Sequence, residues 1–259
     1  MPKLKYTFDD YISNPSGKGS AINAKPNIDQ FEKDLMSLES RNGKSKYTVY
    51  MSTKNAGKSQ VYYIHFLIPS STVGFFNDVV LEFTQNDSDQ SSIRHIKNYN
   101  VKFFANDTNF VYTYAYTFKS HGLLIPELEK KLPLRCLVQK PTMRNPDNAM
   151  GYNKALCYAY VIMTKQGLFS KDTLNRITAS GGLTKLVTTI PNFDQKVKER
   201  NEITKEEKEK GQKKEENNNV KVIKSKGLLG NTPQDLKPKF AKVIGNVKKS
   251  STVKKVKKR

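Results

Sequence analysis

The chain has 259 residues, and its 45 Lys and Arg against 24 Asp and Glu give a formal net charge of +21 at pH 7. This length accommodates one sizeable domain or two small ones. So large a positive excess favours a polyanion such as nucleic acid as a partner, and the alternative is that the charge only improves solubility.

Cysteine usage and the N-terminus limit where the protein works. Cys136 and Cys157 provide neither a disulfide framework nor zinc spacing, which predicts reduced thiols in a cytosolic setting. The opening MPKLKYTFDD lacks the apolar core of a signal peptide, and no apolar run is long enough to cross a bilayer. We expect a soluble protein without a classical export signal and without a membrane partner.

The N-terminal part is predicted to contain an arm and a helix. Residues 1–26 are expected to be a flexible arm, because the turn-forming run 13–20 has little to bury. A helix is expected from Asn27, which can act as its N-cap, to Ser40. Its apolar residues recur on one face: Ile28, Phe31, Leu35 and Leu38.

Five strands are predicted in the following block. Alternating or continuous apolar runs separated by turn residues indicate the first four, at residues 47–51, 61–68, 78–83 and 98–104. Residues 109–120, NFVYTYAYTFKS, have an aromatic residue at every second position from Phe110 to Phe118, which is a strand period. This fifth strand would carry five rings on one face, either as part of the core or as a platform for stacking bases.

The second half is predicted to be helical and then disordered. A short helix is expected at 122–131, a proline-rich irregular segment at 133–152 and a buried helix at 153–166 with Gly167 as its C′ residue. Shorter helices are expected at 170–177 and 183–190. The predicted fold class is α+β, a mostly antiparallel five-stranded sheet packed against C-terminal helices. Its predicted domains are the arm (1–26), the body (27–198) and a disordered lysine-rich tail (199–259).

No enzyme motif emerges from the sequence. Gly57-Lys58-Ser59 resembles the end of a phosphate-binding loop, but Ser52 stands where the motif needs its first glycine and a strand follows, which indicates a hairpin turn. His65, His95 and His121 are scattered without zinc or Cys–His spacing, and His65 is expected to be a core residue.

Two other functional patterns are weak. Asp78 and Glu82 share one face of a predicted strand and are the carboxylates on which a metal-dependent nuclease would depend. Residues 170–190 have a helix–turn–helix outline, but the second helix has one lysine and several threonines for reading bases, so ordinary packing is favoured. We predict no catalytic residue, metal ligand or cofactor.

The C-terminal tail has the strongest functional signal. Residues 221–259 contain 13 Lys and Arg and a single acidic residue, Asp235. Lysines that neutralise phosphates give salt-sensitive binding, and the scarcity of arginine argues against bidentate base reading. The residues predicted to bind nucleic acid are Lys248, Lys249, Lys254, Lys255, Lys257, Lys258 and Arg259.

Three segments of the chain are similar to segments of a known group of proteins. They are residues 5–19 (KYTFDDYISNPSGKG), 78–83 (DVVLEF) and 145–148 (NPDN). They resemble uncharacterised virion-associated and structural proteins of tailed bacteriophages of low-GC hosts. The resemblance implies a virion or assembly role, located in the virion or the host cytoplasm, with other phage structural proteins or self-assembly as partners. No site residue follows from it.

Three hypotheses result. The first is a non-enzymatic virion-associated or assembly protein that contacts neighbouring subunits or nucleic acid, without sequence specificity, through its basic tail. The second is a single-stranded nucleic-acid-binding protein of phage replication or expression, with the aromatic strand as its stacking platform. The third is a nuclease that depends on Asp78 and Glu82.

Overall fold

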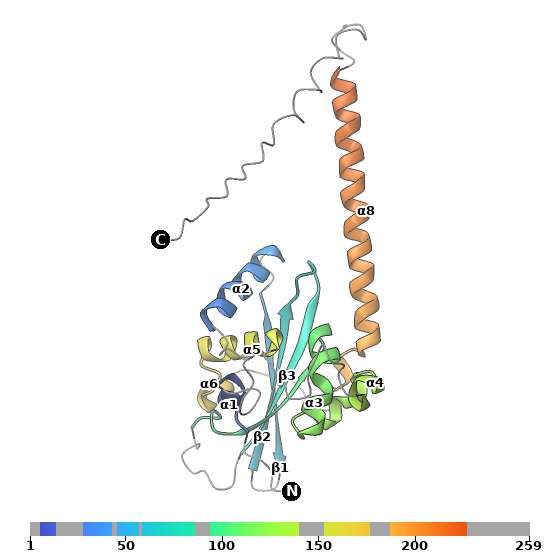
Figure 1. The fold of residues 1–259 in the computed structure, drawn as a ribbon. Helices are drawn as coiled ribbons and strands as arrows, with labels where there is room; N and C mark the ends of the chain where they lie inside the picture. The colour runs from blue at the N-terminus through green and yellow to red at the C-terminus, as the bar shows by residue number, and fades with distance from the viewer. Residues whose placement is uncertain are drawn as a thin grey trace, which may run out of the picture. The chain divides into compact units, whose positions relative to one another are not determined.

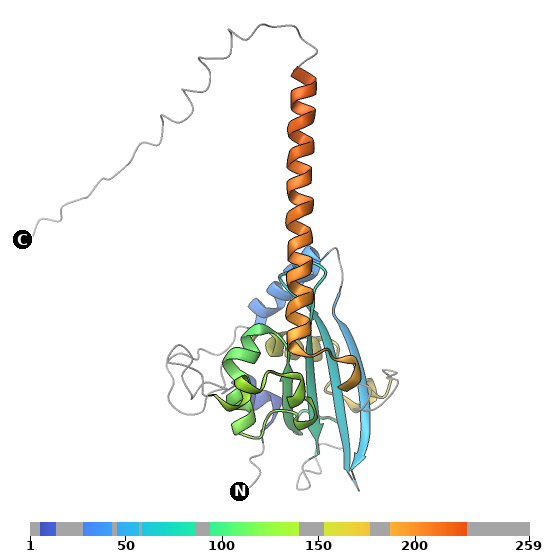
Figure 2. The same ribbon diagram turned by 90° about the vertical axis from the view of Figure 1, so that its right-hand side faces the viewer.

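The structure is a computed structural model that describes residues 6–13, 28–42, 46–56, 59–85, 94–139, 153–176 and 187–226. The chain forms two compact units, Met1–Glu206 and Glu207–Arg259. The first unit contains a four-stranded antiparallel sheet in the order β1-β2-β3-β4 (Figures 1 and 2). Its strands are β1 (Thr48–Ala56), β2 (Ser59–Pro69), β3 (Phe76–Thr84) and β4 (Asn100–Ala105).

Each strand pairs with the next one along the chain, so the four strands form an antiparallel meander. Ala56, the last residue of β1, pairs with Ser59, the first residue of β2. Gly57 and Lys58, where a hairpin turn was predicted, lie outside the described part. β3 pairs with β2 over its whole length, from Thr84 opposite Val61 to Phe76 opposite Pro69. β4 pairs with β3 on the other side.

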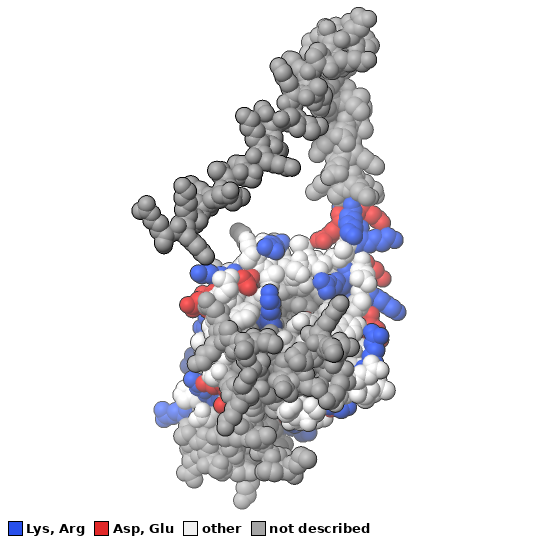
Figure 3. Space-filling view, in the orientation of Figure 1, with Lys and Arg blue, Asp and Glu red and all other residues white. Residues whose placement is uncertain are grey.

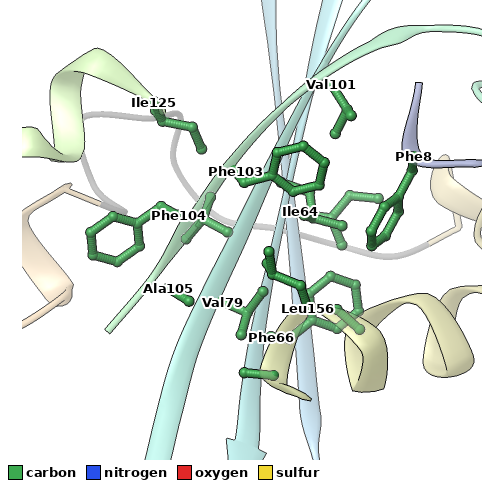
Figure 4. Packing of buried hydrophobic residues seen from close by; sticks show 14 of the residues in the cluster. Phe8, Ile64, Phe66, Val79, Val101, Phe103, Phe104, Ala105, Ile125 and Leu156 are labelled. Carbon is green, nitrogen blue, oxygen red and sulfur yellow. The ribbon is translucent and has the colours of Figure 1, made fainter. Parts of the chain in front are cut away.

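One face of the sheet, the core face, packs against helices. Ile64, Phe66, Val79 and Phe103 are fully buried on it, and Figure 4 shows them with Phe8 and Leu156 from helices far apart in the sequence. These helices are α1 (Phe8–Ser13), α2 (Ile28–Arg41) and α5 (Lys154–Lys165). Asn153 caps α5 by accepting a hydrogen bond from the amide of Leu156 at 3.1 Å, and Gly167 follows the helix with φ of +63°.

Successive side chains of a strand point to opposite sides, so the same strands form a second face. We call it the second face and define it by His65, Asp78, Val80, Glu82 and Phe104. Every residue of β3 from Asp78 to Phe83 is buried, so both faces are covered. Figures 1 and 2 show α1 and α5 together on one side of the sheet. The ring of Phe118, from α3 (Ala115–Ser120), contacts Tyr11 of α1 and Phe103 of β4 at centroid distances of 5.9 and 5.3 Å.

The elements after the sheet are short, except for the last one. They are the π-helix η2 (Phe110–Tyr114), α3 (Ala115–Ser120), the 3₁₀-helix η3 (Pro126–Lys131), α4 (Leu134–Val138), α6 (Lys171–Leu174) and α8 (Phe193–Lys226). The α+β class and the antiparallel sheet are therefore confirmed.

The predicted helix–turn–helix at residues 170–190 is described only at α6 and from residue 187 onward, because residues 177–186 lie outside the described part.

The predicted fifth strand is wrong, because residues 110–120 form η2 and α3 instead. The outer edge of β4, where a fifth strand would pair, is occupied. The amide of Phe103 donates to the carbonyl of Leu123 at 2.7 Å, and the amide of Val101 donates to the carbonyl of Tyr6 at 2.9 Å. The aromatic residues therefore pack as a helix beside the sheet.

The predicted flexible arm is wrong for residues 6–13. Phe8 and Tyr11 are fully buried, and the hydroxyl of Tyr11 accepts a hydrogen bond from the amide of Asn153 at 2.9 Å. The ring of Phe8 contacts those of Phe103 and Tyr160 at centroid distances of 5.5 and 5.2 Å. These aromatic contacts hold α1 in the core, whereas residues 14–27 lie outside the described part.

The predicted start of disorder at residue 199 is also wrong, because α8 continues to Lys226. Its sequence is rich in Lys, Glu and Gln, which favour helices, and opposite charges recur four residues apart, as at Lys205 and Glu209 or Glu206 and Lys210. Such pairs support a helix without an apolar stripe. Residues 227–259 lie outside the described part.

Candidate functional site

A cluster of polar side chains is buried on the second face, where β2 and β3 meet the start of α8. Asp78, at its centre, is 3% exposed. Its Oδ1 lies 2.9 Å from His65 Nε2, and its Oδ2 accepts hydrogen bonds from Lys196 Nζ at 2.7 Å and Asn106 Nδ2 at 2.6 Å. We call His65, Asp78, Asn106 and Lys196 the Asp78 cluster.

Backbone pairing fixes the position of this cluster. In the register of β2 and β3, Leu67 lies opposite Asp78 and His65 opposite Val80, which makes His65 and Asp78 diagonal neighbours on one face. Asn106 directly follows β4 and accepts a hydrogen bond from the amide of Asp78 at 2.7 Å. β2, β3 and the residue after β4 therefore position the Asp78 carboxylate, and α8 adds the cation, Lys196.

Two opposing effects act on the pKa of Asp78. Burial raises the pKa of a carboxyl group, but the hydrogen bond to His65 and the charge of Lys196 outweigh burial, so the pKa of Asp78 is lowered from its ordinary value. Asp78 is therefore ionised at neutral pH and paired with the buried ammonium group of Lys196. Removal of one partner of such a pair typically costs about 3–5 kcal/mol of stability, because the other charge stays buried.

The cluster also fixes the start of α8. Phe193, Lys196 and Arg200 lie at i, i+3 and i+7, on one side of the helix. Phe193 is 2% exposed and packs edge-on against Tyr112 at 5.6 Å between ring centroids. Arg200 donates to the hydroxyls of Thr72 and Thr108, both at 3.3 Å. The first turns of α8 are thus anchored by an aromatic contact, a buried ion pair and a bridging arginine.

A second polar group lies on the same face, one row along the sheet. Ser52, Tyr63, Glu82 and Lys102 are directly opposite one another across the four strands. Glu82 pairs with Lys102 at 3.0 Å, and burial together with Glu82 raises the pKa of Tyr63. The Oγ of Ser52 has no hydrogen-bond partner among the described residues.

Asp78 and Glu82 share a strand face, as predicted, but they do not converge on one point. Four residues of strand separate them, which is about 13 Å, and each carboxylate has its own lysine. Within the described ranges, no group of three or more His, Cys, Asp or Glu side chains is arranged to hold a metal ion. The two carboxylates therefore act as separate ion-pair partners and not as a shared pair of metal ligands.

The aromatic segment presents one open ring instead of a ladder of five. Phe110 and Phe118 are fully buried, as expected for core residues, whereas Tyr112 is 43% exposed. The guanidinium of Arg135 lies over the Tyr112 ring at 5.6 Å and donates to its hydroxyl at 3.2 Å. A helix points its successive side chains around its axis, so this segment has no continuous stacking face.

The predicted phosphate-binding residues Lys248, Lys249, Lys254, Lys255, Lys257, Lys258 and Arg259 lie outside the described residues. They belong to the second unit, residues 207–259, which contains 17 Lys and Arg against 5 Asp and Glu, a net charge of +12. Figure 3 shows Lys and Arg alternating with Asp and Glu along the described part of α8. The mixed charge of that part contrasts with the nearly uniform positive charge of residues 221–259.

Sequence reasoning did not find Lys196 or its pairing with Asp78. An aspartate within the apolar strand sequence NDVVLEF requires a buried cation or donor, which is a usable signal. The sequence does not indicate which of the 45 Lys and Arg supplies it. His65, by contrast, is a buried strand residue with a hydrogen-bond partner, as predicted.

Comparisons of the chain with protein-family models, with curated proteins and with solved structures return no match.

Among the helices that the structure describes, none combines the length and the apolar character needed to cross a membrane.

Proposed function

We propose that this chain is a non-enzymatic nucleic-acid-binding protein that contacts phosphates through its lysine-rich C-terminal unit. The supporting observation is the separation of charge along the chain. The 53 residues after Glu206 have a net charge of +12, and the far longer first unit has only +9. A concentration of lysines of this kind binds phosphates through counterion release, independently of base sequence.

The anchored start of α8 supports the same proposal. The Asp78 cluster, Phe193 and Arg200 attach the first turns of the helix to the sheet of the first unit. The first turns of α8, the helix from which the basic segment continues, are therefore part of the α+β body. A chain of this kind can connect nucleic acid, bound by the C-terminal unit, to a partner bound by the α+β body.

The resemblance to bacteriophage proteins suggests the setting for this link. We propose a virion-associated or assembly role, in which other phage structural proteins or further copies of the chain are partners of the body. Mass spectrometry of purified particles tests the setting independently of the binding chemistry. Detection of the chain at a fixed ratio to a major structural protein supports it, and absence from the particles contradicts it.

The binding chemistry is tested by fluorescence anisotropy with labelled duplex DNA of two unrelated sequences. The test variant replaces the seven predicted binding residues, Lys248, Lys249, Lys254, Lys255, Lys257, Lys258 and Arg259, by glutamine. The control variant replaces seven exposed cations of the first unit. The proposal predicts similar affinity for both sequences and a large loss of affinity only in the test variant. Equal losses in the two variants would contradict it.

A further inference from the structure

A pocket of about 450 Å³ lies where the start of β1 meets the end of α5 and α6. Its lining residues are Lys46, Tyr47, Val49, Gln166, Leu168, Thr173 and Arg176. The volume is within the range of about 300–1,000 Å³ that small-molecule sites span. None of the residues used above to explain the anchoring of α8 takes part in it.

The pocket is positively charged. Lys46 and Arg176 are both exposed at its wall, and its lining contains no carboxylate. Neither cationic side chain forms an ion pair or a hydrogen bond with another residue in the described ranges. Two cations without anionic partners, converging on one hollow, favour an anionic group such as a phosphate, to which arginine can donate two parallel hydrogen bonds.

The remaining lining is aromatic and apolar. Tyr47 accepts a hydrogen bond on its hydroxyl from Gln166 Nε2 at 2.8 Å, and its ring packs against the core. Val49 is half-buried and Leu168 is 2% exposed. A fixed aromatic ring beside an apolar floor suits a flat aromatic ring such as a nucleobase, which a simple inorganic anion lacks.

We propose that this pocket binds a nucleoside monophosphate unit, with the phosphate at Lys46 and Arg176 and the base against Tyr47. The unit is either a free nucleotide or one residue of a single strand, since the two share this chemistry. The inference rests on the proposed nucleic-acid-binding function and adds to it a second contact, on the body, that discriminates bases from bare phosphate.

The test is a titration of the isotope-labelled full-length chain, followed by two-dimensional NMR, with four probes. They are adenosine 5′-monophosphate, adenosine, inorganic phosphate and a short oligodeoxyadenylate. We expect the nucleotide to shift the resonances of the pocket lining and to bind more tightly than either adenosine or phosphate. If Arg176→Gln lowers the affinity for the oligonucleotide as it does for the nucleotide, the pocket takes one residue of a single strand. If Arg176→Gln leaves the oligonucleotide affinity unchanged, that affinity comes from residues 207–259 and the pocket takes the free nucleotide.

Variants separate the two recognition elements. Arg176→Gln and Tyr47→Ala are each expected to raise the Kd for the nucleotide about 10-fold, equivalent to 1.4 kcal/mol. Tyr47→Phe keeps the ring and should weaken binding less than Tyr47→Ala. Lys33→Gln removes an exposed cation of α2 that does not line the pocket and serves as the matched control.

Three results overturn the inference: no nucleotide binding, equal binding of phosphate and nucleotide, or the same response of Arg176→Gln and Lys33→Gln. Thermal unfolding of each variant shows whether a loss of binding comes from a loss of folding. Failure of the pocket is distinguishable from failure of the proposed function, because binding of long duplex DNA through residues 207–259 would then persist.

Discussion

At Asp78, burial and pairing act in opposite directions on one carboxyl group. Burial in a sheet region disfavours the charged form, and the hydrogen bond with His65 and the charge of Lys196 outweigh this effect, so the pKa of Asp78 is lowered. The sequence correctly placed Asp78 and Glu82 on one strand face. It could not identify Lys196, 118 residues away along the chain, because no local pattern couples a strand to a distant helix.

The variant Asp78→Asn tests the energetic role of this pairing. It keeps the shape of the side chain but leaves the ammonium group of Lys196 buried without a counter-charge. We expect a loss of about 3–5 kcal/mol in the free energy of unfolding, measured by urea denaturation. The exposed Asp172→Asn of α6 is the control and should change stability by no more than about 0.5 kcal/mol.

The double variant Asp78→Asn/Lys196→Met sharpens this test. Removal of the second charge relieves the uncompensated burial, so the double variant should be more stable than Asp78→Asn alone. Additive losses from the two substitutions would show that the two side chains do not act on each other.

The pH dependence follows from the lowered pKa of Asp78. A carboxyl with a folded-state pKa below its unfolded value of about 3.9 stabilises the fold above that pH, and the contribution is lost as the pH falls through the folded pKa. The stability gap between the wild type and Asp78→Asn should therefore be full at neutral pH and shrink in this acid range. A gap that stays constant in urea denaturation on both sides of that range would refute the pairing.

At the scale of secondary-structure elements, the sequence correctly predicted the strands and helices that a local pattern of apolar residues indicates. The four strands, the helix at residues 28–41 and the buried α5 all follow from periodic or continuous runs of apolar residues. The aromatic segment shows the limit of this approach. Its rings recur at every second residue, but its buried positions, Phe110, Val111, Ala115 and Phe118, follow helical spacing. The edge of β4 was already occupied, so tertiary context decided the outcome.

Helix α8 extends into a segment that was predicted to be disordered, again because interactions other than a local apolar pattern decide the structure. Mixed charge without an apolar stripe resembles the composition of disordered segments, yet charge pairs and an anchored first turn favour a helix.

Gly211 interrupts the good helix formers of this segment. Replacement of a helix-interior glycine by alanine gains about 0.5–1 kcal/mol, so Gly211→Ala should slow amide hydrogen exchange after residue 211. Unchanged exchange there would show that glycine does not limit the helix.

At the scale of the whole molecule, the chain combines a body with a mixed-charge surface and a C-terminal unit of strongly positive charge. Composition predicts that the basic tail begins at residue 199, whereas the first compact unit ends at Glu206. The sequence also indicated the kind of chemistry, phosphate binding by lysine. It could not show the pocket at Lys46 and Arg176, since these residues are 130 positions apart and meet only in the fold.

The central claim, phosphate binding through the C-terminal cations, is tested most directly by the salt dependence of DNA affinity. For duplex DNA, the slope of log K against log salt concentration is about −0.9 per phosphate neutralised. We predict a steep slope for the full chain and a slope several units shallower for the variant with glutamine at Lys248, Lys249, Lys254, Lys255, Lys257, Lys258 and Arg259. Equal slopes for the two proteins would contradict the account.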